Sequence, residues 1–163
     1  INADAKHVLR ANFHDISVIY HIIKENHEEV LPCSIPDILG MFDRFYLYDD
    51  GEVRGVISWQ VLPVMDLMEP DFCLEVISFS VRRTDQGKGI GTVLLNHVLE
   101  ILKDFNPNRI IVLTFHSAFF EKFGFTKTSK EFLYPKIYLG CINCTKYKSP
   151  LTCPEVAMEI KLK

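Results

Sequence analysis

Residues 86–91, which read QGKGIG, constrain this chain more than any other stretch. They follow an apolar run at 73–81 and precede a helical pattern at 90–105, so the sequence predicts a strand, a glycine turn and a helix N-terminus. Glycines let the backbone approach a ligand closely, and the free N–H groups of a helix start attract anions. Glycines in a turn are usually only a turn, but this flanking periodicity favours a phosphate-binding site.

Length and composition exclude several classes of protein. The 163 residues fit one domain, residues 1–163, with a sizeable core. The formal net charge of −3 argues against nucleic-acid binding, which normally needs a basic excess. No apolar run approaches the roughly 18 residues of a membrane span, and residues 1–6 lack the apolar stretch of a signal peptide. Five cysteines without a secretory signal indicate reduced thiols, so we expect a cytoplasmic protein.

Hydrophobic patterns predict alternating strands and helices along the chain. Apolar and β-branched runs indicate strands at residues 8–11, 45–48, 53–61, 73–82, 109–115, 125–128 and 155–162. Apolar residues at helical spacing indicate helices at 14–25, 36–43, 90–105 and 116–123. The acidic turn at 49–52 contains a glycine and predicts a hairpin between two of the strands.

Two motifs resemble those of a known family. Residues 79–91 read FSVRRTDQGKGIG and resemble the acetyl-coenzyme A signature of the GNAT acetyltransferase superfamily, with Gln86, Gly89 and Gly91 at its defining positions. Residues 119–125 read FFEKFGF and resemble the second signature, aromatic-Glu-Lys-x-Gly-Phe. The resemblance implies a mixed α/β (α+β) fold of about seven mostly antiparallel strands with helices on both faces. A parallel pair of strands would splay at the cofactor site.

The resemblance also implies acetyl-coenzyme A (acetyl-CoA) as co-substrate. Main-chain amides of the turn would hold its pyrophosphate, and main-chain groups of the preceding strand would bind the pantetheine arm and polarise the thioester carbonyl. Phe120 is expected to contact the cofactor where many members carry a tyrosine general acid. The expected cofactor-binding residues are Phe79, Ser80, Val81, Gln86, Gly87, Lys88, Gly89, Ile90, Gly91, Thr92 and Phe120.

Other segments resemble the short N-acetylglutamate synthase-like branch, which acetylates the α-amine of L-glutamate. They are residues 31–34, 136–138 and 155–158 and the cysteines between the last two. Two arginines of that branch are replaced here, by Cys33 and Ile77, although a dicarboxylate substrate needs cations. Arg82, Arg83 and Lys136 could compensate, and the expected substrate-binding residues are Cys33, Ile77, Arg82 and Lys136. Another small amine, a peptide N-terminus, or a sensor domain without turnover remain alternatives, and a homodimer is left open.

Three residues are candidates for proton transfer during attack of a neutral amine on the thioester. Glu75 lies in an apolar strand and could act as the general base, perhaps through a water; the alternative is an exposed Glu at a strand edge. His116 directly follows the strand at 109–115, but such a residue more often caps a helix or lies at the surface. Because Phe120 cannot donate a proton, either Tyr134 or Tyr138 acts as the acid, with Tyr134 as the candidate, or the thiolate leaves without help.

Among Cys141, Cys144 and Cys153, the first two are separated by two residues, which is a spacing typical of metal ligands. Structural zinc needs four ligands, however, and no histidine follows His116. We therefore expect no metal, with these three cysteines as a weak candidate site; the alternative is reduced thiols or a labile disulfide.

Overall fold

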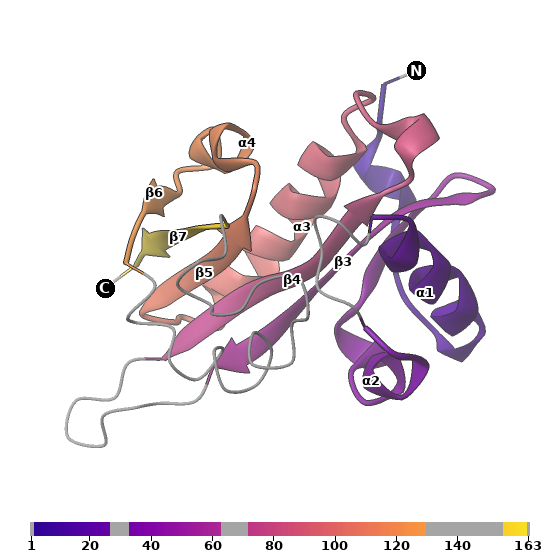
Figure 1. Ribbon diagram of the computed structural model, residues 1–163, viewed down its shortest axis with the longest axis horizontal. Coiled ribbons are helices and arrows are strands. Elements are labelled where there is room, and N and C mark those ends of the chain that lie inside the picture. Colours follow the sequence, from indigo (N-terminus) through magenta and orange to yellow (C-terminus); the bar gives the residue numbers. More distant parts are fainter. Residues whose placement is uncertain (1, 27–32, 63–71, 130–154, 163) are drawn as a thin grey trace. The chain divides into compact units, whose positions relative to one another are not determined.

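The structure is a computed structural model that describes residues 2–26, 33–62, 72–129 and 155–162 (Figure 1). Within these residues one sheet has seven strands, hydrogen-bonded in the order β1-β2-β3-β4-β5-β7-β6. The strands are β1 (Val8–Arg10), β2 (Tyr46–Asp49), β3 (Val53–Leu62), β4 (Cys73–Val81), β5 (Arg109–Thr114), β6 (Thr126–Lys127) and β7 (Val156–Lys161). The helices are α1 (Ile16–Glu25), α2 (Ile35–Leu39), α3 (Ile90–Asp104) and α4 (Ser117–Glu121).

The sheet is mostly antiparallel, with β4 and β5 as a parallel pair, which confirms the predicted fold class. The predicted helices differ from the observed ones mainly at their ends. The helix expected at 36–43 is instead α2 followed by a 3-10 turn, Phe42–Arg44, with Gly40 as the C-cap of α2. The helix expected at 14–25 begins with a 3-10 turn, Phe13–Asp15, because Asn12 and Asp15 form a capping box there.

By its internal contacts the chain divides into two compact units, which we describe separately. The N-terminal unit contains Ile1–Gln60 and Val76–Asp104, and the C-terminal unit contains Val61–Glu75 and Phe105–Lys163. None of the described helices is both long and apolar enough to cross a membrane.

Helices cover both faces of the sheet in the N-terminal unit, as predicted (Figure 1). Leu47 of β2 pairs with Val56 of β3, and both belong to a core cluster with residues of α1 and α2. The neighbouring pair, Tyr48 and Gly55, points to the other face because strand residues alternate. A Cβ added to Gly55 would lie 3.0 Å from the side chain of Leu94, so this glycine lets α3 approach the sheet.

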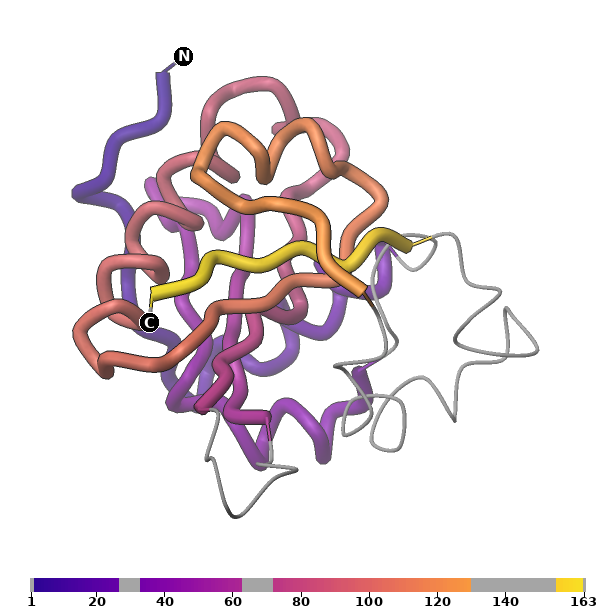
Figure 2. Tube along the Cα trace, turned by 90° about the vertical axis from the view of Figure 1, so that its left-hand side faces the viewer, coloured from indigo at the N-terminus to yellow at the C-terminus, as the bar shows by residue number. Residues whose placement is uncertain are grey.

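The C-terminal unit is built on the antiparallel pair of β5 and β7. Arg109 pairs with Lys161 at one end and Thr114 with Val156 at the other. β7 also pairs with β6, so the last strand of the sequence lies between two earlier ones (Figure 2). The small core of this unit contains Leu62, Cys73, Ile111 and Ala157.

Candidate functional site

The glycine turn has the geometry of an anion cradle. Gly87 and Gly89 have φ of 81° and 85°, in the left-handed region that favours glycine. Val93 N donates a hydrogen bond to Gly89 O at 3.1 Å, as the first rung of the helical ladder. The main-chain N–H groups of the residues before Val93 therefore precede that ladder, at the positive end of α3. These residues are Ile90, Gly91 and Thr92.

The amide side chains of Asn26, which is buried, and Gln86, which is exposed, tie the end of β4 to the turn. Asn26, the C-cap of α1, donates from Nδ2 to Ile22 O at 3.1 Å and to Val81 O at 3.2 Å. Gln86 donates from Nε2 to the same Val81 O at 3.3 Å and to Asn26 Oδ1 at 3.5 Å. The side chain of Gln86 therefore holds the turn against the strand end. The carbonyl of Val81 already accepts two bonds, although its main chain was predicted to serve the cofactor.

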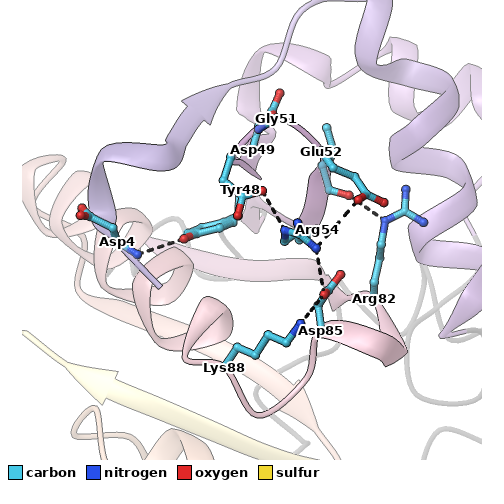
Figure 3. A network of polar contacts seen from close by, with 11 residues as sticks. Asp4, Tyr48, Asp49, Gly51, Glu52, Arg54, Arg82, Asp85 and Lys88 are labelled. Carbon is cyan, nitrogen blue, oxygen red and sulfur yellow. Dashed lines mark hydrogen bonds and ion pairs between the residues drawn. The ribbon is translucent and has the colours of Figure 1, made fainter. Parts of the chain in front are cut away.

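A cluster of charges lies beside the turn, with Lys88 and Arg54 both pointing toward Asp85 (Figure 3). Asp85 is 3% exposed, and its Oδ1 accepts hydrogen bonds from Lys88 Nζ at 2.9 Å and Arg54 Nη1 at 3.0 Å. Arg54 Nε also donates to Asp50 Oδ1 at 2.7 Å. The hydrogen bond from Lys88 and the charges of Lys88 and Arg54 hold the pKa of Asp85 below its ordinary value, although burial opposes this shift. Sequence reasoning did not identify Asp85, because an Asp three residues before a Lys is usually an ordinary solvated pair.

Arg82 is hydrogen-bonded to the neighbouring strand β3 through its main chain and one nitrogen of its side chain. Its Nε donates to Val53 O at 2.7 Å, and its main-chain N donates to Arg54 O at 2.8 Å. Arg82 is half-buried, and no carboxylate in the described part of the chain pairs with its guanidinium. Among the described residues only Nε of the three guanidinium nitrogens has a hydrogen-bond partner, and the role of Arg82 in substrate binding stays a prediction.

Strand β4 is irregular where the pantetheine contacts were predicted. Ser78 has a φ of 52°, in the left-handed region, which interrupts the alternation of side chains as a β-bulge does. Phe79 and Val81 are half-buried, whereas Ser80 is buried, and its Oγ has no hydrogen-bond partner within the described residues. A buried hydroxyl without a partner is costly, and the predicted contact of Ser80 with the cofactor would supply one.

The three proton-transfer candidates have different surroundings. Glu75 has no exposed surface, so its alternative interpretation as an exposed strand-edge residue is wrong. His116 is exposed at the N-cap position of α4, but its side chain does not cap the helix. Phe120 is buried, with ring centroids 5.2 Å from Phe119 and 5.4 Å from Phe125. Tyr134 lies outside the described residues.

Two of the four predicted substrate-binding positions, Cys33 and Ile77, are apolar in character. Cys33 packs against the core cluster of α1 and α2; burial, and to a lesser extent Asp37, raise the pKa of its thiol to about 11. Ile77 is half-buried on β4. Lys136 and the three cysteines of the weak metal candidate, Cys141, Cys144 and Cys153, lie outside the described residues.

The two units divide the predicted site residues between them. The N-terminal unit brings together the turn, the charge cluster, Asn26 and Arg82, and it also contains Phe79–Val81, Cys33 and Ile77. The C-terminal unit contains Glu75, His116 and Phe120. The cradle is therefore complete within one unit, from segments far apart in the sequence.

The mixed sheet, with a strand, a glycine turn and a helix start in this order, matches the fold of GNAT acetyltransferases, and comparisons with known proteins specify the family. The profile of the acetyltransferase (GNAT) family matches residues 16–125, more than half of the chain. An uncharacterized N-acetyltransferase of Chlorobaculum tepidum is 34% identical over 154 residues, which are 93% of each protein. The chain therefore belongs to the GNAT family and is an N-acetyltransferase with acetyl-CoA as co-substrate.

Solved structures have the same fold. Rv2747 from Mycobacterium tuberculosis, solved in complex with CoA, is 20% identical with a TM-score of 0.75; the match covers 96% of this chain and 99% of that one. N-acetylglutamate synthase from Neisseria gonorrhoeae, complexed with coenzyme A and N-acetyl-glutamate, is 20% identical with a TM-score of 0.74. That match covers 96% of this chain but 35% of the synthase.

Proposed function

We propose that this acetyltransferase modifies the amine of a small amino acid, with L-glutamate as the first candidate. The observation that carries the proposal is the half-buried Arg82, which directly precedes the turn region and has guanidinium nitrogens left for a carboxylate. The resemblance of residues 31–34 and 155–158 to the N-acetylglutamate synthase-like branch supports glutamate. The complex of the structurally similar synthase with N-acetyl-glutamate supports it further.

In this proposal the chain's own groups have distinct roles. The N–H groups of Ile90, Gly91 and Thr92 hold the pyrophosphate, and main-chain groups of residues 79–81 line the pantetheine arm. The neutral amine attacks the thioester carbonyl carbon, a C–N bond forms, the C–S bond breaks, and the amine proton passes to Glu75. Phe120 cannot protonate the departing sulfur. A thiolate whose conjugate acid has a pKa of about 8.5 is an acceptable leaving group without such help.

A thiol-release assay tests this proposal. The protein is incubated with acetyl-CoA and glutamate, glutamine, aspartate, alanine, lysine or a short peptide, and free thiol is followed. We expect fastest release with glutamate. Release with the peptide alone and with none of the amino acids would overturn the proposal, and cofactor binding without any release would favour a sensor.

Arg82→Gln tests the residue on which the proposal depends. We expect the KM for the amino acid to rise about 10-fold or more, since a charged hydrogen-bond pair contributes roughly 1.5–3 kcal/mol. The KM for acetyl-CoA should change little. Arg83→Gln is the matched control, because the neighbouring Arg83 is exposed. Equal effects of the two substitutions would remove Arg82 from substrate recognition.

A second candidate function, acetylation of a less acidic amine or a peptide N-terminus, is favoured by one observation. Cys33 and Ile77 stand where the synthase-like branch has arginines, and the raised pKa of Cys33 keeps its thiol neutral at pH 7. These two positions supply no charge for a second carboxylate. Faster release with alanine or a peptide than with glutamate would support this function.

A further inference from the structure

We propose that Asp85 is a positioning residue for cofactor binding: it fixes the conformation of the turn at 86–89, with Lys88 as its counter-ion rather than as a ligand of the pyrophosphate. The inference rests on the proposed role of this turn as the cofactor cradle. It assigns a function to a buried acid and redefines the function of the lysine within the glycine motif.

Burial makes the contacts of Asp85 different from those of a surface pair. Its side chain is 4% exposed, and a buried carboxylate is stable only when paired and hydrogen-bonded. Arg54 and Lys88 supply two short charge-assisted bonds to the same oxygen, Oδ1. The pair Lys6–Asp4 is by contrast 3.8 Å long and well exposed on both sides.

These contacts act where the backbone is least restricted. Lys88 lies between Gly87 and Gly89, and glycine has more backbone freedom than any other residue type. The side chain of Lys88 is bonded to Asp85, and its main-chain carbonyl accepts a hydrogen bond from Ala3 N at 3.1 Å. The middle of the turn is thus held at two points. A turn ordered in advance loses less entropy when a ligand binds.

The local charge also argues against Lys88 as a phosphate ligand. In the ion pairs of this cluster the two cations Arg54 and Lys88 are matched by three carboxylates, Asp50, Glu52 and Asp85, so the charge of Lys88 is already paired. Attraction of a pyrophosphate must then come from main-chain N–H groups and the start of α3. Binding of CoA should accordingly depend only weakly on salt, since few unpaired side-chain charges take part.

A double-mutant cycle tests whether Asp85 and Lys88 act as a unit. Asp85→Asn, Lys88→Met and the double variant are compared with the wild type by calorimetric titration with CoA and by steady-state kinetics. We expect each single substitution to raise the Kd of CoA and the KM of acetyl-CoA roughly 5- to 20-fold, with kcat within about 2-fold, as expected for one charged hydrogen bond. The Kd of CoA for the double variant should be no higher than that of the single variant with the higher Kd. Glu52→Gln is the control, because this exposed carboxylate is 3.9 Å from Arg54.

Hydrogen exchange of the ligand-free proteins separates this inference from the proposed function. Amides of residues 86–92 should exchange faster in both single variants than in the wild type, with Tm reporting whether each variant is folded. Unchanged exchange in the folded variants would overturn the positioning role, whatever the affinity for CoA. Additive effects, or tighter CoA binding by Asp85→Asn together with weaker binding by Lys88→Met, would show instead that Lys88 contacts phosphate. If residues 86–92 exchange more slowly in the wild type than in the variants, but the wild type does not bind CoA, the proposed function is overturned and the positioning of the turn by Asp85 is not.

Discussion

Two buried carboxylates of this chain have similar partners in different structural surroundings. Asp85 in the N-terminal unit is paired with Lys88 at 2.9 Å and Arg54 at 3.0 Å. Glu159 in the C-terminal unit is 5% exposed and is paired with Arg109 at 3.2 Å. Asp85 precedes a glycine turn, whereas Glu159 lies within β7, where its main chain pairs with β5 and β6.

This difference indicates what each cluster does. The backbone around Glu159 is already fixed by strand pairing. Its ion pairs can therefore add stability, but they have little influence on the backbone conformation. Its second partner, Lys161, is 3.6 Å away and its side chain is 71% exposed. Lys88 is closer to its acid and only 37% exposed, and it belongs to a turn without a hydrogen-bond ladder. The same chemistry should therefore control ligand binding in one region and stability in the other.

The largest expected effect separates two glycines of left-handed conformation, one in each region. Gly89 has a φ of 85° and Gly124 a φ of 94°. Gly89→Val should abolish CoA binding in calorimetric titration, because a β-branched residue disfavours this φ and its side chain adds bulk at the cradle. Gly124→Val carries similar backbone strain and should lower Tm while leaving CoA affinity within about 2-fold, since a Cβ there meets nothing within 4 Å. Survival of CoA binding in Gly89→Val would disprove the cradle assignment.

Glu75 extends the comparison to a third buried carboxylate. If it collects the amine proton, Glu75→Gln should lower kcat about 100-fold or more and alter the pH dependence of kcat, because general-base catalysis contributes at least this factor. The Kd of CoA should be unchanged. Glu159→Gln, the matched substitution of a buried acid, should retain kcat. An unchanged kcat for Glu75→Gln would exclude Glu75 from the mechanism.

The stability role of Glu159 gives a smaller effect. Glu159→Gln should destabilise the protein by about 1–3 kcal/mol, because Arg109 loses a charged, largely buried partner. Thermal unfolding should shift down by several degrees, at roughly 2–4 °C per kcal/mol in a chain of this size. The Kd of CoA should not change. An increase in this Kd comparable to that of Asp85→Asn would contradict the distinction between the two clusters.

Acid should remove the contribution of Asp85 to stability. Lys88 and Arg54 lower its pKa from an ordinary value of 3.8, so its pairing stabilises the fold above that value and is lost as pH falls through the folded-state pKa. Both partners stay protonated in this range. The difference in Tm between wild type and Asp85→Asn should be constant from pH 7 to about 5 and should disappear below the folded-state pKa. A difference that shrinks between pH 7 and 5 would contradict this assignment.

Cys33 should show the smallest effect. Burial raises the pKa of its thiol to about 11, so the thiol is protonated at neutral pH and reacts slowly. Alkylation of Cys33 by iodoacetamide, followed by peptide mass spectrometry, should accelerate only as pH approaches that value. Cys33→Ala should leave CoA affinity unchanged. Rapid alkylation at pH 7 in folded protein would show that the thiol is not buried in this way.

Local periodicity was sufficient for most of the secondary structure. Alternating apolar residues predicted β4, helical spacing predicted α3, and the glycines between them predicted the turn. These signals come from neighbours in sequence, which decide strand and helix largely by their spacing. The end of α2 was placed too late, since a short helix has few periodic positions to define it.

The side-chain partners of the turn could not be predicted in this way. Arg54 and Asp85 are 31 positions apart, and Asn26 and Gln86 are 60 apart, so no local pattern connects them. Ser78 gives no signal of its left-handed backbone, because serine usually occupies ordinary extended conformations in strands. The insertion of β7 between β5 and β6 likewise depends on long-range pairing.

By itself, the sequence determined the family and the donor, and it predicted the residues of the cradle, because strand, glycine turn and helix start are contiguous in the chain. Only the tertiary structure decided what the cradle's side chains do. Folding turns Lys88 toward a buried acid and Gln86 toward a strand end, which in our proposal leaves the main-chain N–H groups for the ligand. Such a distribution of charge follows from burial and distance in the folded chain, which spacing along the sequence does not specify.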